Sequence, residues 1–491
     1  MSRAEGLRSR IEASPRYAWI VLATALFGLF AVGSTVTILA VAIPTIAADL
    51  HSDVNTVSWV TTGPLLAFAV FGPALSKLAD LRGQRRAYLL SLGGVAVFAG
   101  LAAVSWSAGA LILFRVLGAA VGAATAPASL AIINRLFPRE KRAQAMGYWS
   151  MVGAGGPVVG ALIGGPVVET IGWRWIFIAQ APITVLTLVV AYVVLPDLRP
   201  VAGASDARLD IKGAVTLGLG TSVLLLAVNR GPKVGWGHPL VLLGFVLAPV
   251  LLVSFFAIER RVEHPLLPLA YLRRRNFTFP MATILFTNFA YMGAFMITPY
   301  LLEEQFGFSV THTTVLSISR PLVFAIAGPI AGYFTLRIGE RSATTAGAVS
   351  IVVSMIALSA LAPGNPWFGI AAALGVSGLG MGLMSPALSA AIANAVDDGD
   401  LGIAGATQQM VGQVGSSIGG QVMLAVQTAR AASVGEVGAY GEAYLVGGAF
   451  AVVGVVAALL VRSSRHPVRD RGAPEGAPAT VGEPVLAGAT P

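Results

Sequence analysis

The sequence predicts an all-α integral membrane protein built from two six-helix bundles, with two further transmembrane helices inserted between them. Three observations predict this fold class. Hydrophobic residues make up 56% of the 491 residues and charged residues only 11%, which is unlike a soluble protein. Apolar runs of the length needed to span a bilayer, about 20 residues, recur along the chain. Two long stretches of the sequence also repeat each other.

The apolar runs predict fourteen transmembrane helices. Their expected ranges are 18–46, 54–78, 87–106, 109–134, 142–168, 174–195, 211–229, 239–258, 277–302, 312–335, 342–361, 367–394, 401–428 and 442–461. Short segments rich in Arg, Gly and Pro separate them, as is typical of a multi-pass membrane protein.

Positive charge predicts the orientation. Most of the 32 lysines and arginines fall in the N-terminal segment, in the loops after even-numbered helices, and in the C-terminal tail. The opposite side holds Arg174, Arg230, Lys233 and Arg430. Loops rich in lysine and arginine stay on the cytoplasmic side, so we expect a plasma (inner) membrane protein with both termini in the cytoplasm. The net charge of +9 is therefore attributed to topology, and no nucleic-acid partner is expected.

The internal repeat relates the two ends of the chain. "GAATAPASLAIIN" resembles "GMGLMSPALSAAIAN", which places Pro127 and Pro386 259 residues apart. A nearby offset superimposes "SKLADLRGQRR" on "GYFTLRIGERS" and Gly83 on Gly339. The offset exceeds the length of six helices, so two extra helices are expected between the halves. Parallel repeats of this kind place a substrate path at their interface.

The expected domain organisation follows from the repeat. It comprises a cytoplasmic N-terminal segment (1–17), an N-terminal bundle (18–196), a linker with the two inserted helices (197–275), a C-terminal bundle (276–462) and a disordered cytoplasmic tail (463–491). The tail is rich in Pro, Gly and Ala and cannot bury enough apolar surface to fold alone.

The loop "LADLRGQRRAYL" between helices two and three is a candidate conformational gate. Gly83 allows a tight turn, and Asp80 can accept hydrogen bonds from a neighbouring helix start. A simple positively charged loop would explain Arg85 and Arg86, but it would explain neither Asp80 nor Gly83.

Helix five carries "GAGGPVVGALIGG", in which Gly153, Gly156 and Gly160 fall on one face. Small residues at this spacing allow close packing of membrane helices, and Pro157 favours a bend. We expect "AGPIAG" of helix ten (327–332) to be the partner surface. Packing without any role in movement is the alternative.

Two arginines lie within predicted spans. A charge in hydrocarbon is costly, so Arg115 and Arg320 are expected to face protein or a water-filled cavity. A structural hydrogen-bonding role is the alternative for Arg115. For Arg320 the alternative is an ion pair with Glu303 or Glu304, its nearest acidic neighbours in sequence.

Amide, thioether, hydroxyl and aromatic side chains suggest a cavity for amphipathic molecules. The candidates come from helices one, five, nine and thirteen. They are Thr35, Tyr148, Trp149, Asn288, Met292, Phe295, Gln408 and Gln409. Ordinary packing within the bundles would explain any one of them.

An enzymatic function is not expected. The sequence contains neither a G-x-x-x-x-G-K-[ST] nucleotide loop nor an H-E-x-x-H motif, and its histidines are not clustered. Asp397, Asp398 and Asp400 resemble half of a calcium loop, but their position between two helices predicts a solvated turn. No metal and no cofactor are therefore expected.

These motifs resemble the major facilitator superfamily, and specifically its fourteen-helix drug:proton antiporter branch. Asp80 and its loop resemble the superfamily signature, Arg115 the helix-four arginine, and "GGPVVG" with Pro157 the antiporter motif. "LDIKGA" and "ERRVEHPLLPL" are similar to segments bordering the inserted helices. The resemblance fails at Thr35, where the branch has a carboxylate associated with proton coupling, and at Gln180, where asparagine is usual.

The resemblance implies a monomeric secondary transporter that exports lipophilic or amphipathic molecules by alternating access, driven by a proton gradient. Because helix one lacks its acid, we expect Glu303 or Glu304 to carry the proton, with Arg320 lowering its affinity. The expected partners are protons, membrane lipids and a small-molecule or lipid-like substrate. The alternatives are a lipid translocator without a proton cycle and a membrane sensor that does not transport.

Overall fold

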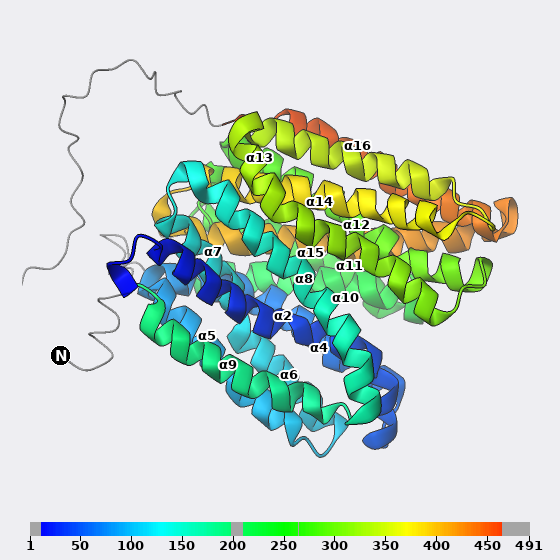
Figure 1. Ribbon diagram of the computed structural model, residues 1–491, viewed down its shortest axis with the longest axis horizontal. Coiled ribbons are helices and arrows are strands. Elements are labelled where there is room, and N and C mark those ends of the chain that lie inside the picture. Colours follow the sequence, from blue (N-terminus) through cyan, green and yellow to red (C-terminus); the bar gives the residue numbers. More distant parts are fainter. Residues whose placement is uncertain (1–10, 198–209, 264, 464–491) are drawn as a thin grey trace, which may run out of the picture.

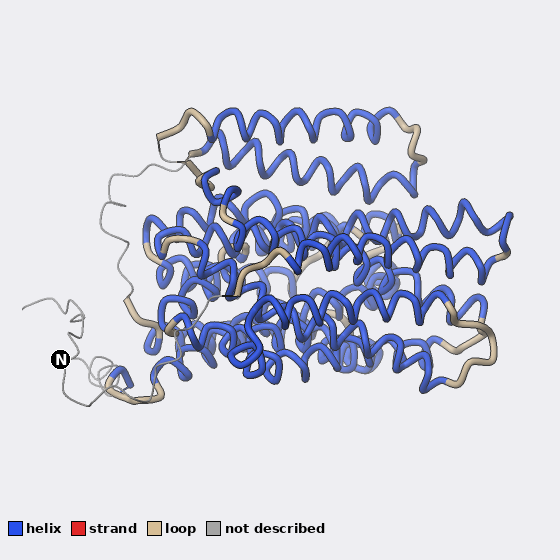
Figure 2. Tube along the Cα trace, turned by 90° about the horizontal axis from the view of Figure 1, so that it is seen from above, coloured by secondary structure: helices blue, strands red, loops and turns tan. Residues whose placement is uncertain are grey.

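The computed structural model describes residues 11–197, 210–263 and 265–463. In this part of the chain every regular element is a helix, which confirms the predicted all-α class. Most of the predicted terminal segments 1–17 and 463–491 lies outside the described residues. Nearly all helices run along the long axis of the molecule, as Figure 2 shows.

The N-terminal half of the chain forms one group of helices (Figure 1). They are α2 (Tyr17–Asp49), α3 (Val54–Val57), α4 (Trp59–Arg82), α5 (Gln84–Ala103), α6 (Ala108–Gly122), α7 (Thr125–Leu136), η1 (Arg139–Lys141), α8 (Arg142–Thr170) and α9 (Arg174–Val194). The predicted helices 54–78 and 109–134 are each divided in two, between α3 and α4 and between α6 and α7.

The inserted hairpin is formed by α10 (Ile211–Val234) and α11 (Pro239–Glu259). The C-terminal half comprises η2 (Leu269–Arg273), α12 (Arg275–Tyr300), the π turn η3 (Leu301–Gln305), α13 (Val310–Ser359), α14 (Trp367–Ala395), η4 (Asp398–Asp400), α15 (Leu401–Val434) and α16 (Glu436–Leu459). The predicted helices 312–335 and 342–361 meet within α13 at Gly339, the one non-helical residue in it (φ +80°). The last helix begins at Glu436, six residues earlier than predicted.

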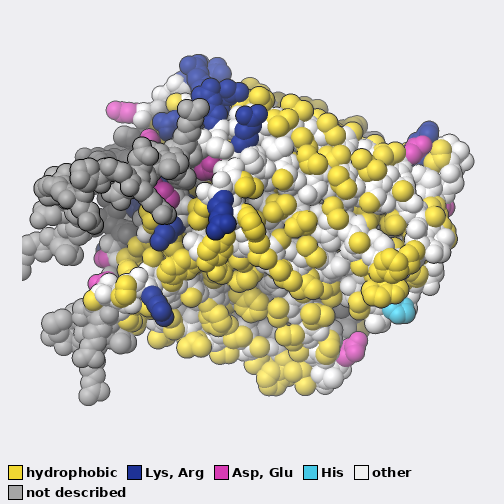
Figure 3. Space-filling model, turned by 45° about the horizontal axis from the view of Figure 1, so that its top comes forward, with side chains coloured by type: hydrophobic (Ala, Val, Ile, Leu, Met, Phe, Trp, Pro, Cys, Tyr) yellow, Lys and Arg dark blue, Asp and Glu magenta, His cyan; other side chains and the backbone are white. Residues whose placement is uncertain are grey.

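The outer surface is typical of a multi-pass membrane protein. Eleven helical stretches of the described residues are long and apolar enough to cross a bilayer. On α11, Leu240, Val246 and Val253 are 65–71% exposed, although they are strongly apolar. Hydrophobic side chains cover most of the face in Figure 3, while lysines and arginines gather toward the end where the chain begins. We call this end, which carries Arg82, Arg86 and Arg139, the arginine-rich face.

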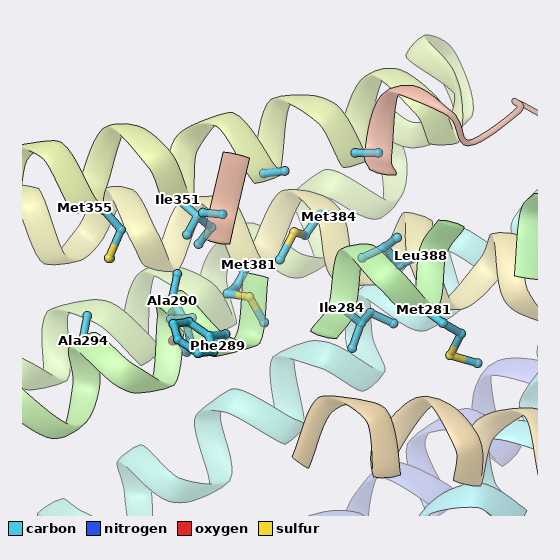
Figure 4. Close-up of a cluster of buried hydrophobic side chains, with 14 of the residues drawn as sticks. Met281, Ile284, Phe289, Ala290, Ala294, Ile351, Met355, Met381, Met384 and Leu388 are labelled. Atoms are coloured by element: carbon cyan, nitrogen blue, oxygen red, sulfur yellow. The ribbon is translucent and has the colours of Figure 1, made fainter. Parts of the chain in front are cut away.

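The two halves bury separate hydrophobic clusters. The largest lies in the C-terminal half, where Met281 and Ile284 of α12, Ile351 of α13, and Met381 and Met384 of α14 pack together (Figure 4). Three smaller clusters contain residues of the N-terminal half alone. Movement of one half against the other would therefore leave most of the core packing intact.

The inserted hairpin contacts both halves through α10. A Cβ on Gly218 of α10 would lie 2.7 Å from the carbonyl oxygen of Val70, so α10 packs backbone to backbone on α4. One turn further, the Thr221 hydroxyl lies 3.4 Å from the sulfur of Met410 on α15. The hairpin thus covers the seam between α4 and α15.

Candidate functional site

Asp80 joins the two halves at the arginine-rich face. Its carboxylate accepts hydrogen bonds from the backbone N–H groups of Gly402 (3.1 Å) and Ile403 (2.9 Å) at the start of α15. The Gln84 amide donates to the same carboxylate, and the Asp80 side chain is buried. A helix start has unpaired N–H groups and a partial positive charge, so it favours a carboxylate. Asp80 of the N-terminal half therefore caps the start of α15 in the C-terminal half.

The other predicted gate residues support Asp80 within their own half. Gly83 has φ +106°, a conformation open to glycine, and it turns the chain from α4 into α5. The Arg85 guanidinium donates to the carbonyl oxygen of Tyr192 at 2.6 Å and lies 5.4 Å from the Tyr192 ring. Arg86 is exposed. Of the four predicted gate residues, only Asp80 bonds to the opposite half.

A second contact between the halves is an ion pair that the sequence did not indicate. The Lys77 ammonium lies 2.7 Å from Asp400 of η4, and both side chains are largely buried. Asp400 also accepts a hydrogen bond from the Tyr271 hydroxyl at 2.8 Å. Burial raises the pKa of Tyr271, which keeps this hydroxyl a proton donor. The predicted solvated turn is therefore wrong for Asp400.

Two arginines of the N-terminal half complete the contact. Arg135 donates to the carbonyl oxygen of Asp398 at 2.8 Å. Arg142 donates to the Asn394 side-chain oxygen at 2.9 Å, and 5% of Arg142 is exposed. Charge-assisted hydrogen bonds of this kind are worth more than neutral ones when buried. We call these contacts, with those of Asp80 and Lys77, the gate.

Helices α8 and α13 approach each other directly behind the gate. A Cβ on Gly147 would lie 2.6 Å from the carbonyl oxygen of Gly328, and one on Gly332 would lie 2.7 Å from that of Ala143. The predicted partner surface on helix ten is therefore correct. The predicted close approach through Gly153 is wrong, because a Cβ there would meet nothing within 4 Å.

The remaining residues of the helix-five motif lie beyond this contact. Gly160 lines a space of about 160 Å³ between α2, α8 and α9. Gly156 is buried in α8, and the side chain of Pro157 lies outside the described part of the structure. The helices meet most closely near the arginine-rich face, and within the motif a Cβ on Gly155 would still lie 3.8 Å from the Cβ of Ala325 on α13, so the motif begins where this contact loosens.

Contacts between the halves are confined to one end of the molecule. Several hydrogen bonds join the N- and C-terminal halves among the described residues. The one furthest from the gate links the hydroxyls of Ser150 and Ser385 at 3.0 Å. Ser150 lies about 12 Å along α8 from its start. Toward the other end the two groups of helices spread apart (Figure 1). The molecule is thus closed at the arginine-rich face, and its two halves diverge toward the opposite face.

A cavity of about 390 Å³ begins where the contact between α8 and α13 ends. Its wall contains two predicted residues, Met292 and Phe295, together with Tyr291. Among the described residues, Glu303 of the π turn is the only charged residue in this wall. The hydroxyls of Thr313 and Ser317, also in the wall, are buried and lack a protein partner in the described structure. The wall is therefore mainly apolar with one acid, and two unpaired hydroxyls lie beneath its surface.

A second cavity, of about 240 Å³, lies at the interface of the halves between α2, α4, α7, α10 and α15. Gln409, a predicted cavity residue, lines it together with Gln413 and Thr221. The described residues that line it are all uncharged. It offers amide and hydroxyl groups in otherwise apolar surroundings.

Thr35 occupies the position where the resemblance implies an acid. Its hydroxyl donates to the carbonyl oxygen of Val32 at 3.1 Å and accepts from the Gln180 amide at 2.9 Å. Gln180 also donates to the carbonyl oxygen of Ala31. The two departures from the family pattern therefore contact each other as a neutral, hydrogen-bonded pair.

The two arginines within predicted spans lie inside separate halves. Arg115 lines a small space and lies 5.7 Å from the Phe177 ring. Arg320 is 1% exposed, stacks at 3.9 Å on the Tyr291 ring and donates to the Tyr291 carbonyl oxygen. The alternative ion pair of Arg320 with Glu303 is wrong for this conformation, since no salt bridge to Arg320 occurs among the described residues.

Most of the remaining cavity candidates are held within one half, whereas the Tyr148 hydroxyl of α8 also interacts with that of Tyr333 on α13. The Trp149 indole donates to Ser129, and the Asn288 amide donates to the carbonyl oxygen of Ile284. Tyr148 stacks edge-on against Trp19. The Gln408 amide donates to the Ser389 hydroxyl at 2.7 Å. Glu304, next to Glu303, is exposed. None of these residues lines the two larger cavities.

The fold and the gate define a membrane transporter of two linked halves, and comparisons with known proteins agree. The Major Facilitator Superfamily model matches residues 25–420 and 284–488, so the chain belongs to this family. A crystal structure of the human organic anion transporter MFSD10 has a TM-score of 0.64 at 18% identity, covering 91% of this chain and 100% of that one.

Sequence relatives place the chain in the drug-efflux branch that includes EmrB. It is 30% identical to the tetracenomycin C resistance and export protein of Streptomyces glaucescens, over 88% of this chain and 78% of the relative. The puromycin resistance protein pur8 of Streptomyces alboniger is also 30% identical, over 81% and 79% of the two chains. The multidrug export protein EmrB of Escherichia coli is 30% identical over 63% and 60%. These relatives are transporters, as the sequence predicts for this chain.

Proposed function

We propose that the protein exports lipophilic or amphipathic small molecules in exchange for protons that move inward. The observation that carries the proposal is the position of Glu303, which is the one charged side chain that the described part of the chain contributes to the 390 Å³ cavity beyond the closed gate. A coupling site must meet solvent on one side in one conformation and lie near the substrate, and a membrane carboxylate meets both requirements. The names of the relatives support small toxic compounds as the substrate class.

In this proposal the arginine-rich face is cytoplasmic, both termini lie on that side, and the conformation is outward-facing. The distribution of lysine and arginine supports this orientation. Fourteen crossings follow if α13 supplies one on each side of Gly339 and if α2 and α15 each span the bilayer. An outward-facing carrier would take up a proton at Glu303 while it releases its substrate.

Arg320 would promote proton release in the other half of the cycle. It stacks on the ring of Tyr291, a residue of the cavity wall. When the cavity collapses, the Glu303 carboxylate and the guanidinium would approach, and a nearby positive charge favours the ionised acid. The proton would then leave toward the opened cytoplasmic side.

The proposal is tested with the full-length protein in liposomes that contain a pH-sensitive dye. Tetracenomycin C and puromycin serve as probes, with an imposed pH gradient. We expect substrate-dependent proton movement in the unmodified protein and its loss, by about 5- to 150-fold, in Glu303→Gln. Glu304→Gln is the matched control, because it changes an exposed neighbouring acid. Retained proton-driven export in Glu303→Gln, Glu304→Gln and the double variant would contradict the proposal.

A second candidate function is translocation of a neutral or anionic amphiphile without an obligatory proton cycle. The neutral pair of Thr35 and Gln180 favours it, because it stands where relatives place an acid. The same liposomes separate the two functions: substrate flux unchanged by the pH gradient supports translocation alone. A strong preference for quaternary ammonium dyes would count against this candidate.

A further inference from the structure

Two buried carboxylates meet at the ends of the inserted hairpin. Asp210 caps the start of α10, where its Oδ1 accepts the Gly213 N–H at 2.9 Å. Glu259 is the last residue of α11, and its Oε1 accepts the Leu266 N–H at 3.1 Å. They are 8% and 4% exposed. Each acid therefore has one oxygen bound to the backbone and is shielded from water.

The two carboxylates lie side by side over Gly213. A Cβ on this glycine would lie 2.3 Å from Asp210 Oδ2 and 3.0 Å from Glu259 Oε1. Asp210 Oδ2 and Glu259 Oε2 are fully buried, and neither has a hydrogen-bond partner in the described structure. Two buried carboxylates this close do not both stay ionised without a compensating cation, and a shared proton removes the repulsion.

The surrounding charges come from three elements. Lys77 of α4 is close enough for its charge to act on Glu259. Its ammonium, however, is bound to Asp400 of η4 in the gate. Asp80 of α4 is engaged by α15, and the Tyr271 hydroxyl of η2 donates to Asp400. While the gate is closed, the Lys77 ammonium is thus bound to another acid.

We propose that Asp210 and Glu259 form a proton-binding site that holds one shared proton while the gate is closed. Opening moves Asp400 away with the C-terminal half, and Lys77 becomes available to the carboxylate pair. The proton then leaves to solvent at the arginine-rich face, and Lys77 balances the charge left behind. The inserted hairpin thereby makes gate opening depend on pH at that face, with acid favouring closure.

This inference does not depend on proton-driven export through Glu303. The chain has no native cysteine, so Lys141→Cys and Ser342→Cys give one exposed spin-label site in each half at the arginine-rich face. Distances between the labels are measured by electron paramagnetic resonance on the full-length protein in liposomes across a pH series. We expect the ratio of open to closed gates to rise with pH by up to about tenfold per unit, the limit for one proton.

Substitutions of the pair are expected to remove this pH response and to leave the gate closed. Asp210→Asn keeps a good helix cap, and Glu259→Gln keeps the shape of the side chain. Glu263→Gln, an exposed acid four residues beyond Glu259, is the matched control and should leave the response unchanged. Infrared spectra of the closed state should contain a protonated-carboxyl band that Glu259→Gln removes.

Either of two results would overturn the inference. One is an unchanged pH response in both Asp210→Asn and Glu259→Gln. The other is an infrared spectrum of the closed state that Glu259→Gln leaves unaltered. Thermal unfolding of each variant, measured in parallel, identifies any that fails to fold. If one of the two variants, Asp210→Asn or Glu259→Gln, fails to fold, the pH response of the other variant tests the inference.

Discussion

The loops around Gly83 and Gly339 are two copies of one sequence with different roles. Both glycines have positive φ, +106° and +80°, and each turns the chain between two helices. An arginine follows two residues later in both copies. Three residues before the glycine, however, the first copy has Asp80 and the second has Leu336. The turn is shared, and the acid is present in one copy alone.

The partners of the two loops differ accordingly. Asp80 binds the start of α15 in the opposite half. The second loop instead contacts the end of its own half, where the Arg341 N–H donates to the Ser463 hydroxyl at 3.3 Å. The Asp80 carboxylate, which binds a helix start, is therefore what makes the first loop part of the gate, whereas the second loop is a structural turn.

The largest expected effect comes from removing that carboxylate. Asp80→Ala leaves the N–H groups of Gly402 and Ile403 without their acceptor. The closed gate should lose about 2 kcal/mol, roughly thirtyfold in its population relative to the open gate. Spin-label distances between the halves measure this change. An unaltered distance distribution would contradict the role assigned to Asp80.

An intermediate effect is expected at the glycines. An alanine at positive φ costs about 1–2 kcal/mol, so Gly83→Ala and Gly339→Ala should both lower the free energy of unfolding. Gly83→Ala alone should also shift the gate toward open, because it displaces the helix end that carries Asp80. Thermal unfolding and spin-label distances together separate the two. If Gly83→Ala and Gly339→Ala changed the population of the open gate equally, the two loops would not differ in their roles as we infer.

The smallest effect is expected when the missing acid is introduced. Leu336→Asp restores the residue pattern of the first copy one turn from Gly332, which packs on the first turn of α8. The Arg142 guanidinium at this helix start already binds Asn134 and Asn394, so the gate population should change by less than about twofold, which is below 0.5 kcal/mol. A marked shift toward closure would mean that a carboxylate at this position can form a gate contact in either copy.

Sequence patterns predicted most of the helices. Hydrophobic runs locate spans regardless of tertiary contacts, and helical spacing placed Met292 and Phe295 in one wall. Periodicity gives the face of a helix but not the helix that it meets. For this reason Gly147, rather than Gly153, makes the close contact with α13.

Charged residues far apart in sequence were harder to place. Lys77 and Asp400 are separated by 323 residues, and their ion pair depends on how the two halves meet. Asp210 comes just before α10 and Glu259 ends α11. The two residues come together only because α10 and α11 form a hairpin. No local sequence pattern identifies such pairs. A charged residue next to an apolar run is nevertheless a reason to look for a charged partner elsewhere in the chain.

The position of α10 makes the two seams between the halves mechanically unequal. At the first seam, α10 is packed tightly on α4 and contacts α15. If α4 and α15 separate there, α10 must move with one of them or bend. On the other side α8 and α13 meet through bare glycine backbones with nothing inserted. A rocking motion is therefore restrained by α10 along the seam between α4 and α15, and it has no such restraint along the contact between α8 and α13.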